Sequence, residues 1–199
     1  MKPFTPTRFT LLILLAAAMP SLLGTAAVSP VLDLMKEAGL GPEYVVSLVL
    51  TLPPLATALS GFFIGALSDR IGRVKILAVS LFLFAASGVS GFFLDNIYAI
   101  IALRLILGVS IAGLLPMASA LITEYYEGET RTRYLGYIGV ANGIGVLILQ
   151  TLCGALAAFG WRYAFLVYLL GLCALPFVLI CLREPPRSCK EKSECPVSV

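Results

Sequence analysis

The charged residues best placed to do chemistry lie between two long apolar runs, in residues 64–77. Asp69 stands there among basic residues, and its carboxylate can accept hydrogen bonds from a helix N-terminus or pair with arginine. The basic residues can pair with acids at the end of a later apolar run, or can serve only as topology anchors. We expect ion pairs that hold one conformation and break in another. The residues of this conformational-switch loop are Gly65, Asp69, Arg70, Gly72, Arg73, Lys75 and Glu124.

A second candidate is Arg104, the one charged residue within residues 96–123. It lies about 10 Å along the expected helix, where an arginine is costly unless it faces a cavity or a partner. We expect it to bind an anionic substrate group or to take part in proton coupling, unless it snorkels to the membrane surface. Uncharged polar residues are weaker candidates for the same cavity, because they often bond only to a nearby carbonyl. They are Asn142, Gln150, Thr25 and Ser29.

These residues sit in a chain that is 59% hydrophobic and 13% charged, which is too apolar for a soluble domain of 199 residues. Its charges gather between six apolar windows, each long enough for one helical crossing of about 20 residues and too long for a barrel strand. The sequence therefore predicts an all-α membrane protein with six transmembrane helices. The windows are residues 9–32, 44–68, 76–94, 96–123, 134–161 and 163–182.

Small residues recur four positions apart within these windows, a spacing that lets two helices approach closely. Ordinary packing of the bundle explains any one such pair equally well. The pairs are Gly61 and Gly65, Ser87 and Gly91, Gly108 and Ala112, and Gly139 and Gly143.

Orientation follows from the distribution of Lys and Arg. With the N-terminus inside, eleven of the 14 fall in cytoplasmic segments, so both termini are expected in the cytoplasm. The net charge of +3 then reflects topology and gives no reason to expect a nucleic-acid partner. A cleaved signal peptide at the N-terminus is the alternative, but cleavage would leave five helices and destroy the alternation of charge.

The sequence argues against an enzyme. It contains no histidine and no CxxC pair, which makes a metal site improbable, and no cofactor is expected. An intramembrane serine protease would need a base, and neither histidine nor an intrahelical lysine is available. No nucleotide-binding loop appears, which argues against ATP-driven transport by this chain.

Residues 65–75, GALSDRIGRVK, resemble the loop signature G-x-L-[AS]-D-R-x-G-R of the major facilitator superfamily, between its second and third helices. Arg104 followed by Gly108 resembles a pattern of the fourth helix in that family. The segments GWR at 160–162 and REPPR at 183–187 are also familiar there. Helix 5 lacks the proline of many drug–proton antiporters, and Gln150 stands near its place.

The resemblance implies the N-terminal six-helix half of a twelve-helix transporter, built as a 3+3 inverted repeat. Residues 1–182 would form the bundle and residues 183–199 a cytoplasmic linker or tail. The function implied is secondary active transport of a small organic solute by alternating access, coupled to an ion, in a bacterial cytoplasmic (inner) membrane. The expected partners are the lipid bilayer, the solute, and a missing C-terminal half or a second copy in a parallel dimer. The alternative is a non-transporting membrane interaction protein or a truncated transporter remnant.

The charge distribution predicts the result of reporter fusions. Fusions at Lys36, Asp95 and Arg162 should report an outer location, and fusions at Lys75 and Arg131 an inner one. An outer signal at Lys75 would contradict the topology.

Overall fold

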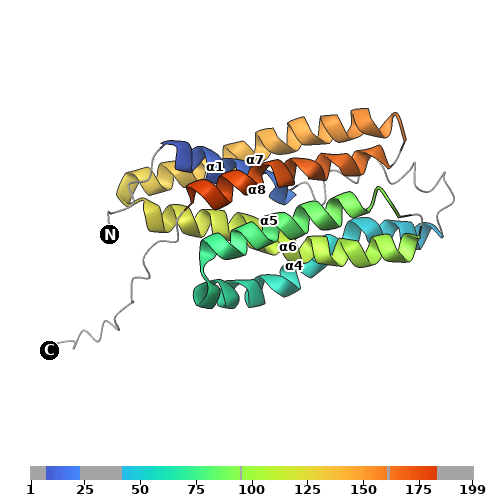
Figure 1. Ribbon diagram of the computed structural model, residues 1–199, viewed down its shortest axis with the longest axis horizontal. Coiled ribbons are helices and arrows are strands. Elements are labelled where there is room, and N and C mark those ends of the chain that lie inside the picture. The colour runs from blue at the N-terminus through green and yellow to red at the C-terminus, as the bar shows by residue number, and fades with distance from the viewer. Residues whose placement is uncertain (1–7, 23–41, 95, 161, 183–199) are drawn as a thin grey trace.

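Apolar runs become helices because hydrocarbon offers backbone N–H and C=O groups no other partner. The computed structural model describes residues 8–22, 42–94, 96–160 and 162–182, and its described part contains four helices long and apolar enough to cross a membrane (Figure 1). They are α4 (Glu43–Ile71), α5 (Arg73–Ser90), α6 (Ile97–Tyr125) and α7 (Gly128–Ala157).

The expected first and sixth helices take a more irregular form. Helix α1 (Arg8–Ala18) continues as a 3₁₀ helix, η1 (Met19–Leu22), and the rest of its window lies outside the described residues. The sixth segment begins as a 3₁₀ helix, η2 (Tyr163–Tyr168), and becomes α-helical only in α8 (Leu169–Cys181). The count of six crossings therefore stays a prediction.

The long helices extend past their apolar windows into charged sequence. The predicted windows leave the charged residues 124–133 between two helices, but the link between α6 and α7 is only Tyr126 and Glu127. Helix α7 starts at Gly128 and places Glu129 in its first turn, where a carboxylate is favourable at the positive end of the helix dipole. Charged residues can therefore continue a helix beyond the hydrocarbon.

A single residue, Gly72, connects α4 to α5. Its φ of 114° is a conformation that side-chain-bearing residues rarely adopt, so glycine is required at this position. Its N–H donates to the Ser68 carbonyl at 2.9 Å, which completes the end of α4. The two helices thus reverse direction with no slack between them, at the same end of the bundle where α6 ends and α7 begins (Figure 1).

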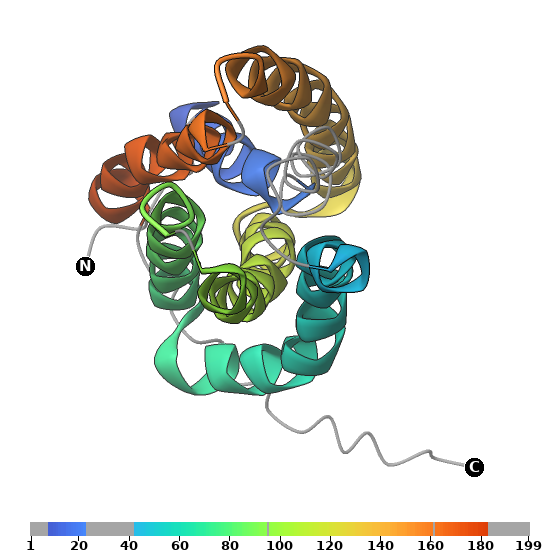
Figure 2. The ribbon, with the colours of Figure 1, turned by 90° about the vertical axis from the view of Figure 1, so that its right-hand side faces the viewer.

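Helix α6 occupies the centre of the bundle and packs against α4, α5 and α1 (Figure 2). In the most apolar 18-residue stretch of each helix, 56% is buried in α5 and in α6, against 28% in α4 and 22% in α7. The outer pair, α4 and α7, therefore offers the largest uncovered apolar surfaces among the four long helices.

The paired glycines fall into two groups, those packed inside the bundle and those on the uncovered faces of α4 and α7. A Cβ on Gly108 would lie 2.5 Å from the Pro53 carbonyl oxygen, and one on Gly91 would lie 2.5 Å from the Phe165 ring. These two glycines allow close helix contacts inside the bundle, as their spacing predicted. A Cβ would meet nothing within 4 Å at four of the other paired glycines, all on α4 or α7: Gly61, Gly65, Gly139 and Gly143.

This division predicts opposite effects for matched substitutions. Gly108→Ala should destabilise the chain by about 1–3 kcal/mol, because the new methyl group overpacks the contact between α6 and α4. Gly139→Ala should leave stability unchanged or raise it, since alanine is the better helix former and the site is open. Thermal unfolding of both variants in the same detergent measures the difference. Equal stability of the two would contradict the close contact at Gly108.

Candidate functional site

Arg73, at the start of α5, joins the ends of three helices. Its Nη1 lies 2.8 Å from Glu124 Oε1 near the end of α6, and its Nη2 lies 3.7 Å from Asp69 Oδ1 near the end of α4. Nη1 also donates to the Ala120 carbonyl oxygen at 3.4 Å. The predicted ion pair between the basic turn and the end of the fourth helix is thus present. We call Asp69, Arg73, Ala120 and Glu124 the Arg73 junction.

The two ion pairs of the Arg73 junction differ in strength. The pair with Glu124 is short and partly shielded, with 28% of the arginine and 34% of the glutamate side chain exposed. Asp69 is 71% exposed and its contact is long, so water screens that pair and it contributes little. The guanidinium also lies beside carbonyls at the negative C-terminal end of α6, which favours a cation. The main link therefore runs from α5 to α6, and Asp69 keeps most of its capacity for other contacts.

The remaining residues of the conformational-switch loop lie around this junction. Gly72 forms the turn, and the side chains of Arg70 and Lys75 are exposed. Gly65 was expected where another helix crosses closely, but a Cβ there would meet nothing within 4 Å. No described helix makes that approach, so the close crossing at Gly65 stays a prediction.

Tyrosines line the adjoining link between α6 and α7, and no motif in the sequence indicated a role for them. The rings of Tyr126 and Tyr134 meet edge to face, with centroids 4.6 Å apart. Burial of the Tyr126 phenol raises its pKa above the ordinary value, and the neighbouring Tyr134 raises it further. Tyr126 therefore stays protonated at neutral pH and adds no charge to this end of the bundle.

Arg104 is buried within the bundle, with 2% of its surface exposed, so it does not snorkel to the membrane surface. Its Nη1 donates to the Tyr168 hydroxyl at 2.8 Å, and its guanidinium carbon lies 5.0 Å from the centre of the Phe165 ring. It is also 5.4 Å from the centre of the Tyr168 ring. Both aromatic residues belong to η2, so cation–π contacts and a hydrogen bond replace water around this cation.

Three buried polar atoms lack a hydrogen-bond partner within the described part of the chain. They are Arg104 Nη2, Asn142 Oδ1 and Ser21 Oγ, which belong to α6, α7 and η1. Buried polar groups are normally satisfied, so each of these atoms requires an explanation. Arg104 Nη2 can therefore donate a hydrogen bond, Asn142 Oδ1 can accept one, and Ser21 Oγ can do either, with a group outside the described residues.

A pocket of about 270 Å³ lies between η1, α4 and α6. It offers the Ser21 and Thr57 hydroxyls within an otherwise apolar lining that includes Ile111 and Leu115. Thr57 Oγ1 already lies 2.8 Å from the Gly108 carbonyl oxygen, whereas Ser21 Oγ has no partner among the described residues. Ser21 and Thr57 belong to no spacing pattern in the sequence, so neither was predicted to line a pocket.

The expected cavity residues do not gather around this pocket. Arg104 and Asn142 are buried but are not among its lining residues. Gln150 is exposed on α7, and Thr25 and Ser29 lie outside the described residues.

The hydrogen bond between Arg104 and Tyr168 predicts the effect of removing the Tyr168 hydroxyl oxygen. Tyr168→Phe should lower the free energy of unfolding by about 1–3 kcal/mol, because a buried guanidinium N–H loses its acceptor. Tyr98→Phe is the matched control, since Tyr98 is 69% exposed, and should change stability by less than about 0.5 kcal/mol. Thermal unfolding in detergent compares the two variants. Equal, small changes would show that the hydrogen bond contributes nothing.

Comparisons with known proteins agree with this architecture. The chain is 29% identical over 141 residues to the niacin transporter NiaP of Acinetobacter baylyi, covering 70% of this chain and 31% of that relative. It is 32% identical over 115 residues to a putative niacin/nicotinamide transporter of Bacillus subtilis, covering 57% of this chain and 28% of that relative. The matched part of the chain therefore covers less than a third of the length of either relative.

A solved structure gives the same fold. The proton:xylose symporter XylE superposes with a TM-score of 0.78 at 19% identity, over 92% of this chain and 46% of the symporter. The family model of the Major Facilitator Superfamily matches residues 14–195. With the loop signature, the bundle and these matches in agreement, this chain belongs to the major facilitator superfamily.

Proposed function

We propose that this chain is the N-terminal half of a secondary transporter that moves a small organic solute across a membrane by alternating access. The observation that carries the proposal is the uncovered surface of α4 and α7. Gly61 and Gly65 on α4, and Gly139 and Gly143 on α7, are small residues with open space beside them. Small residues in membrane helices commonly let a second helix approach, so these faces suit a second bundle.

The second bundle is either a C-terminal six-helix half or a second copy of this chain. The positive-inside distribution of Lys and Arg requires any second copy to insert in the same orientation, which makes the dimer parallel. A parallel arrangement also relates the two halves of the transporters in this family. A pocket at the edge of one bundle would then become the wall of a cavity between two.

We assign the switch between conformations to the Arg73 junction and the residues around it. Arg73 holds α5 to α6, whereas Asp69 is exposed and only weakly engaged, close to the open Gly65. The second bundle, seated on α4, would compete for Asp69 in one conformation and release it in the other. Lys75, which is exposed, is available for the same exchange, and Arg70 belongs to the loop that the sequence predicts.

We assign the solute cavity to the polar residues of the bundle interior. One side-chain atom in each of Arg104, Asn142 and Ser21 has no hydrogen-bond partner among the described residues, which supports this assignment because a bound solute or the second bundle would satisfy it. The sequence adds Gln150, which is exposed on α7, and Thr25 and Ser29, which lie outside the described residues. Arg104 would either bind an anionic group of the solute or take part in ion coupling.

The bacterial relatives suggest a solute and a location. Their names specify niacin and nicotinamide, two pyridines of similar shape that differ in charge. We propose a solute of this size class and a bacterial inner membrane, with both termini and the tail of residues 183–199 in the cytoplasm.

Reconstitution in liposomes tests the proposal. We expect the monomeric chain, identified by crosslinking, to show no uptake of labelled nicotinate or nicotinamide, and the dimer to take up at least one of them. Asp69→Asn should lower dimer uptake at least about tenfold at equal abundance, equivalent to one charge-assisted contact. Glu127→Gln, an exposed acid at the same end, is the matched control and should transport normally.

A further variant separates the two roles of Arg104. Loss of nicotinate uptake alone in Arg104→Gln would indicate an anion-binding residue, whereas loss of both solutes would indicate coupling. Uptake by a monomer would contradict the half-transporter proposal. A folded dimer that neither binds nor transports a solute would instead favour a non-transporting membrane interaction protein.

A further inference from the structure

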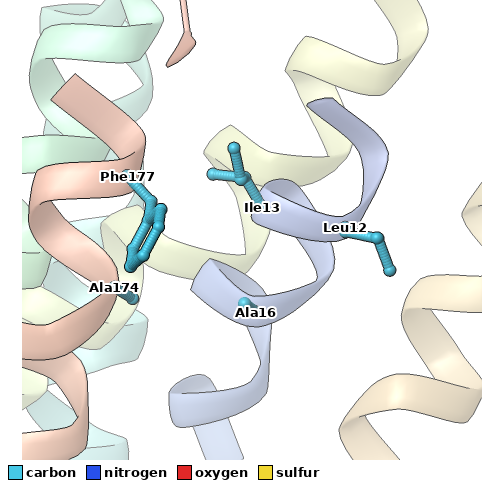
Figure 3. Close-up of a pocket in the computed structure, with 5 residues that line it drawn as sticks. All are labelled: Leu12, Ile13, Ala16, Ala174 and Phe177. Carbon is cyan, nitrogen blue, oxygen red and sulfur yellow. The ribbon is translucent and has the colours of Figure 1, made fainter. Parts of the chain in front are cut away.

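The pocket between η1, α4 and α6 carries two hydroxyl groups, those of Ser21 and Thr57, and its other lining residues are apolar. A second pocket, of about 200 Å³, lies between α1 and α8 and offers apolar side chains alone (Figure 3). Its lining residues are Leu12, Ile13, Ala16, Ala174 and Phe177. Of these two pockets, only the one between η1, α4 and α6 can recognise a polar group through side chains.

The Ser21 hydroxyl differs from other serine hydroxyls of the bundle. Ser110 and Ser119 on α6 donate to carbonyl oxygens three and four residues earlier, at 2.6 and 2.9 Å, as serines in helices commonly do. Ser21 Oγ has no hydrogen-bond partner among the described residues, although only 5% of Ser21 is exposed. A buried hydroxyl in this state is unfavourable, so we expect a ligand to satisfy it. Ser21 can donate its proton to that ligand.

The single proton of the Thr57 hydroxyl is already used inside the bundle. Thr57 Oγ1 lies 2.8 Å from the Pro53 carbonyl oxygen and 2.8 Å from the Gly108 carbonyl oxygen. Carbonyl oxygens only accept hydrogen bonds, so the proton points to them and the lone pairs of Oγ1 remain for another donor. The pocket therefore presents one hydroxyl that can donate to a ligand and one that can only accept from it.

Charge is absent from the described lining of this pocket. The nearest charged residues in the described parts of the three lining elements are Arg104 and Glu124 on α6 and Asp69 on α4. Each lies seven or eight positions from the nearest lining residue of its helix, about 10–12 Å along the axis. An ion that entered the pocket would lose hydration without gaining a counter-charge, so the pocket favours an uncharged group.

We propose that the pocket binds an uncharged carboxamide group of the transported solute, an inference that rests on the proposed transport function. Ser21 donates to the amide carbonyl oxygen and Thr57 accepts from the amide N–H, while the apolar walls contact the attached ring or chain. Gly61 lines the pocket and has open space beside it, so the solute can extend from there toward the second bundle. A carboxylate would bring a charge and no donor for Thr57. Of the two solutes in the relative's name, nicotinamide therefore fits and nicotinate does not.

Three pyridines of similar size test the site. Nicotinamide carries the carboxamide, 3-acetylpyridine keeps the carbonyl oxygen but lacks the N–H, and nicotinate is a carboxylate. Equilibrium dialysis against the full chain in nanodiscs measures the three Kd values, and the pocket lies within one bundle, so binding does not require the dimer. We expect 3-acetylpyridine to bind about tenfold more weakly than nicotinamide, because Thr57 then lacks its donor, and nicotinate to bind more weakly still.

Substitutions assign each contact to its residue. Thr57→Val removes the acceptor and should abolish the difference between nicotinamide and 3-acetylpyridine, whereas Thr57→Ser should keep it. Ser21→Ala should weaken the binding of both about tenfold. Ser119→Ala is the matched control, because that hydroxyl bonds within its own helix, and it should leave all three Kd values unchanged. The comparison of the three pyridines on the unsubstituted chain stands even if a variant fails to fold.

The results separate this site from the transport function. Equal Kd values for nicotinamide and 3-acetylpyridine, tighter binding of nicotinate, or a folded chain that binds none of the three would overturn the carboxamide site. Selectivity that survives Thr57→Val would overturn it as well. Uptake of nicotinate in preference to nicotinamide by the dimer would keep the half-transporter and reject this site. Selective nicotinamide binding without uptake by any species would keep the site and reject the transport function.

Discussion

The constraint on which this structure depends is that hydrocarbon supplies no hydrogen-bond partner. It makes the apolar windows helical, and it sets the surroundings of each polar group inside them. Arg104 shows the constraint most clearly. Its guanidinium lies within the bundle, where the Tyr168 hydroxyl accepts one N–H and the rings of Tyr168 and Phe165 make cation–π contacts. The same constraint makes Asn142 Oδ1, which has no hydrogen-bond partner among the described residues, an indication of function, since hydrocarbon supplies none.

Packing follows a complementary rule. Lipid tails are as apolar as the helices, so association depends on how closely backbones approach. Helix α6 uses Gly108 and Gly113 to contact Pro53 of α4 and Ser80 of α5. The glycines of α4 and α7 that face open space could allow the same close approach, but no described helix lies beside them. The distinction between a bundle interior and an unoccupied interface therefore lies in what surrounds each glycine, and spacing alone does not reveal it.

The sequence predicted the fold well and the site in part. Charge clusters located α4, α5 and α6 to within about four residues at each end, because an uncompensated charge in lipid is costly. They misplaced the start of α7, since charged residues such as Glu129 and Arg131 are good helix formers outside the hydrocarbon. Opposite charges at the ends of successive helices predicted the Arg73–Glu124 pair. The sequence did not reveal Tyr168 as the partner of Arg104 or Ser21 as a pocket residue, because those contacts depend on the packing of distant segments.

The connections at the basic end have a mechanical consequence. One residue joins α4 to α5, two residues join α6 to α7, and Arg73 fastens α5 to α6 across the gap between those turns. Links this short leave no slack for one helix to slide past its neighbour. The short links and the Arg73 ion pair therefore couple the ends of α4, α5, α6 and α7. Such coupling favours a rotation of these ends together over the sliding of one helix past another.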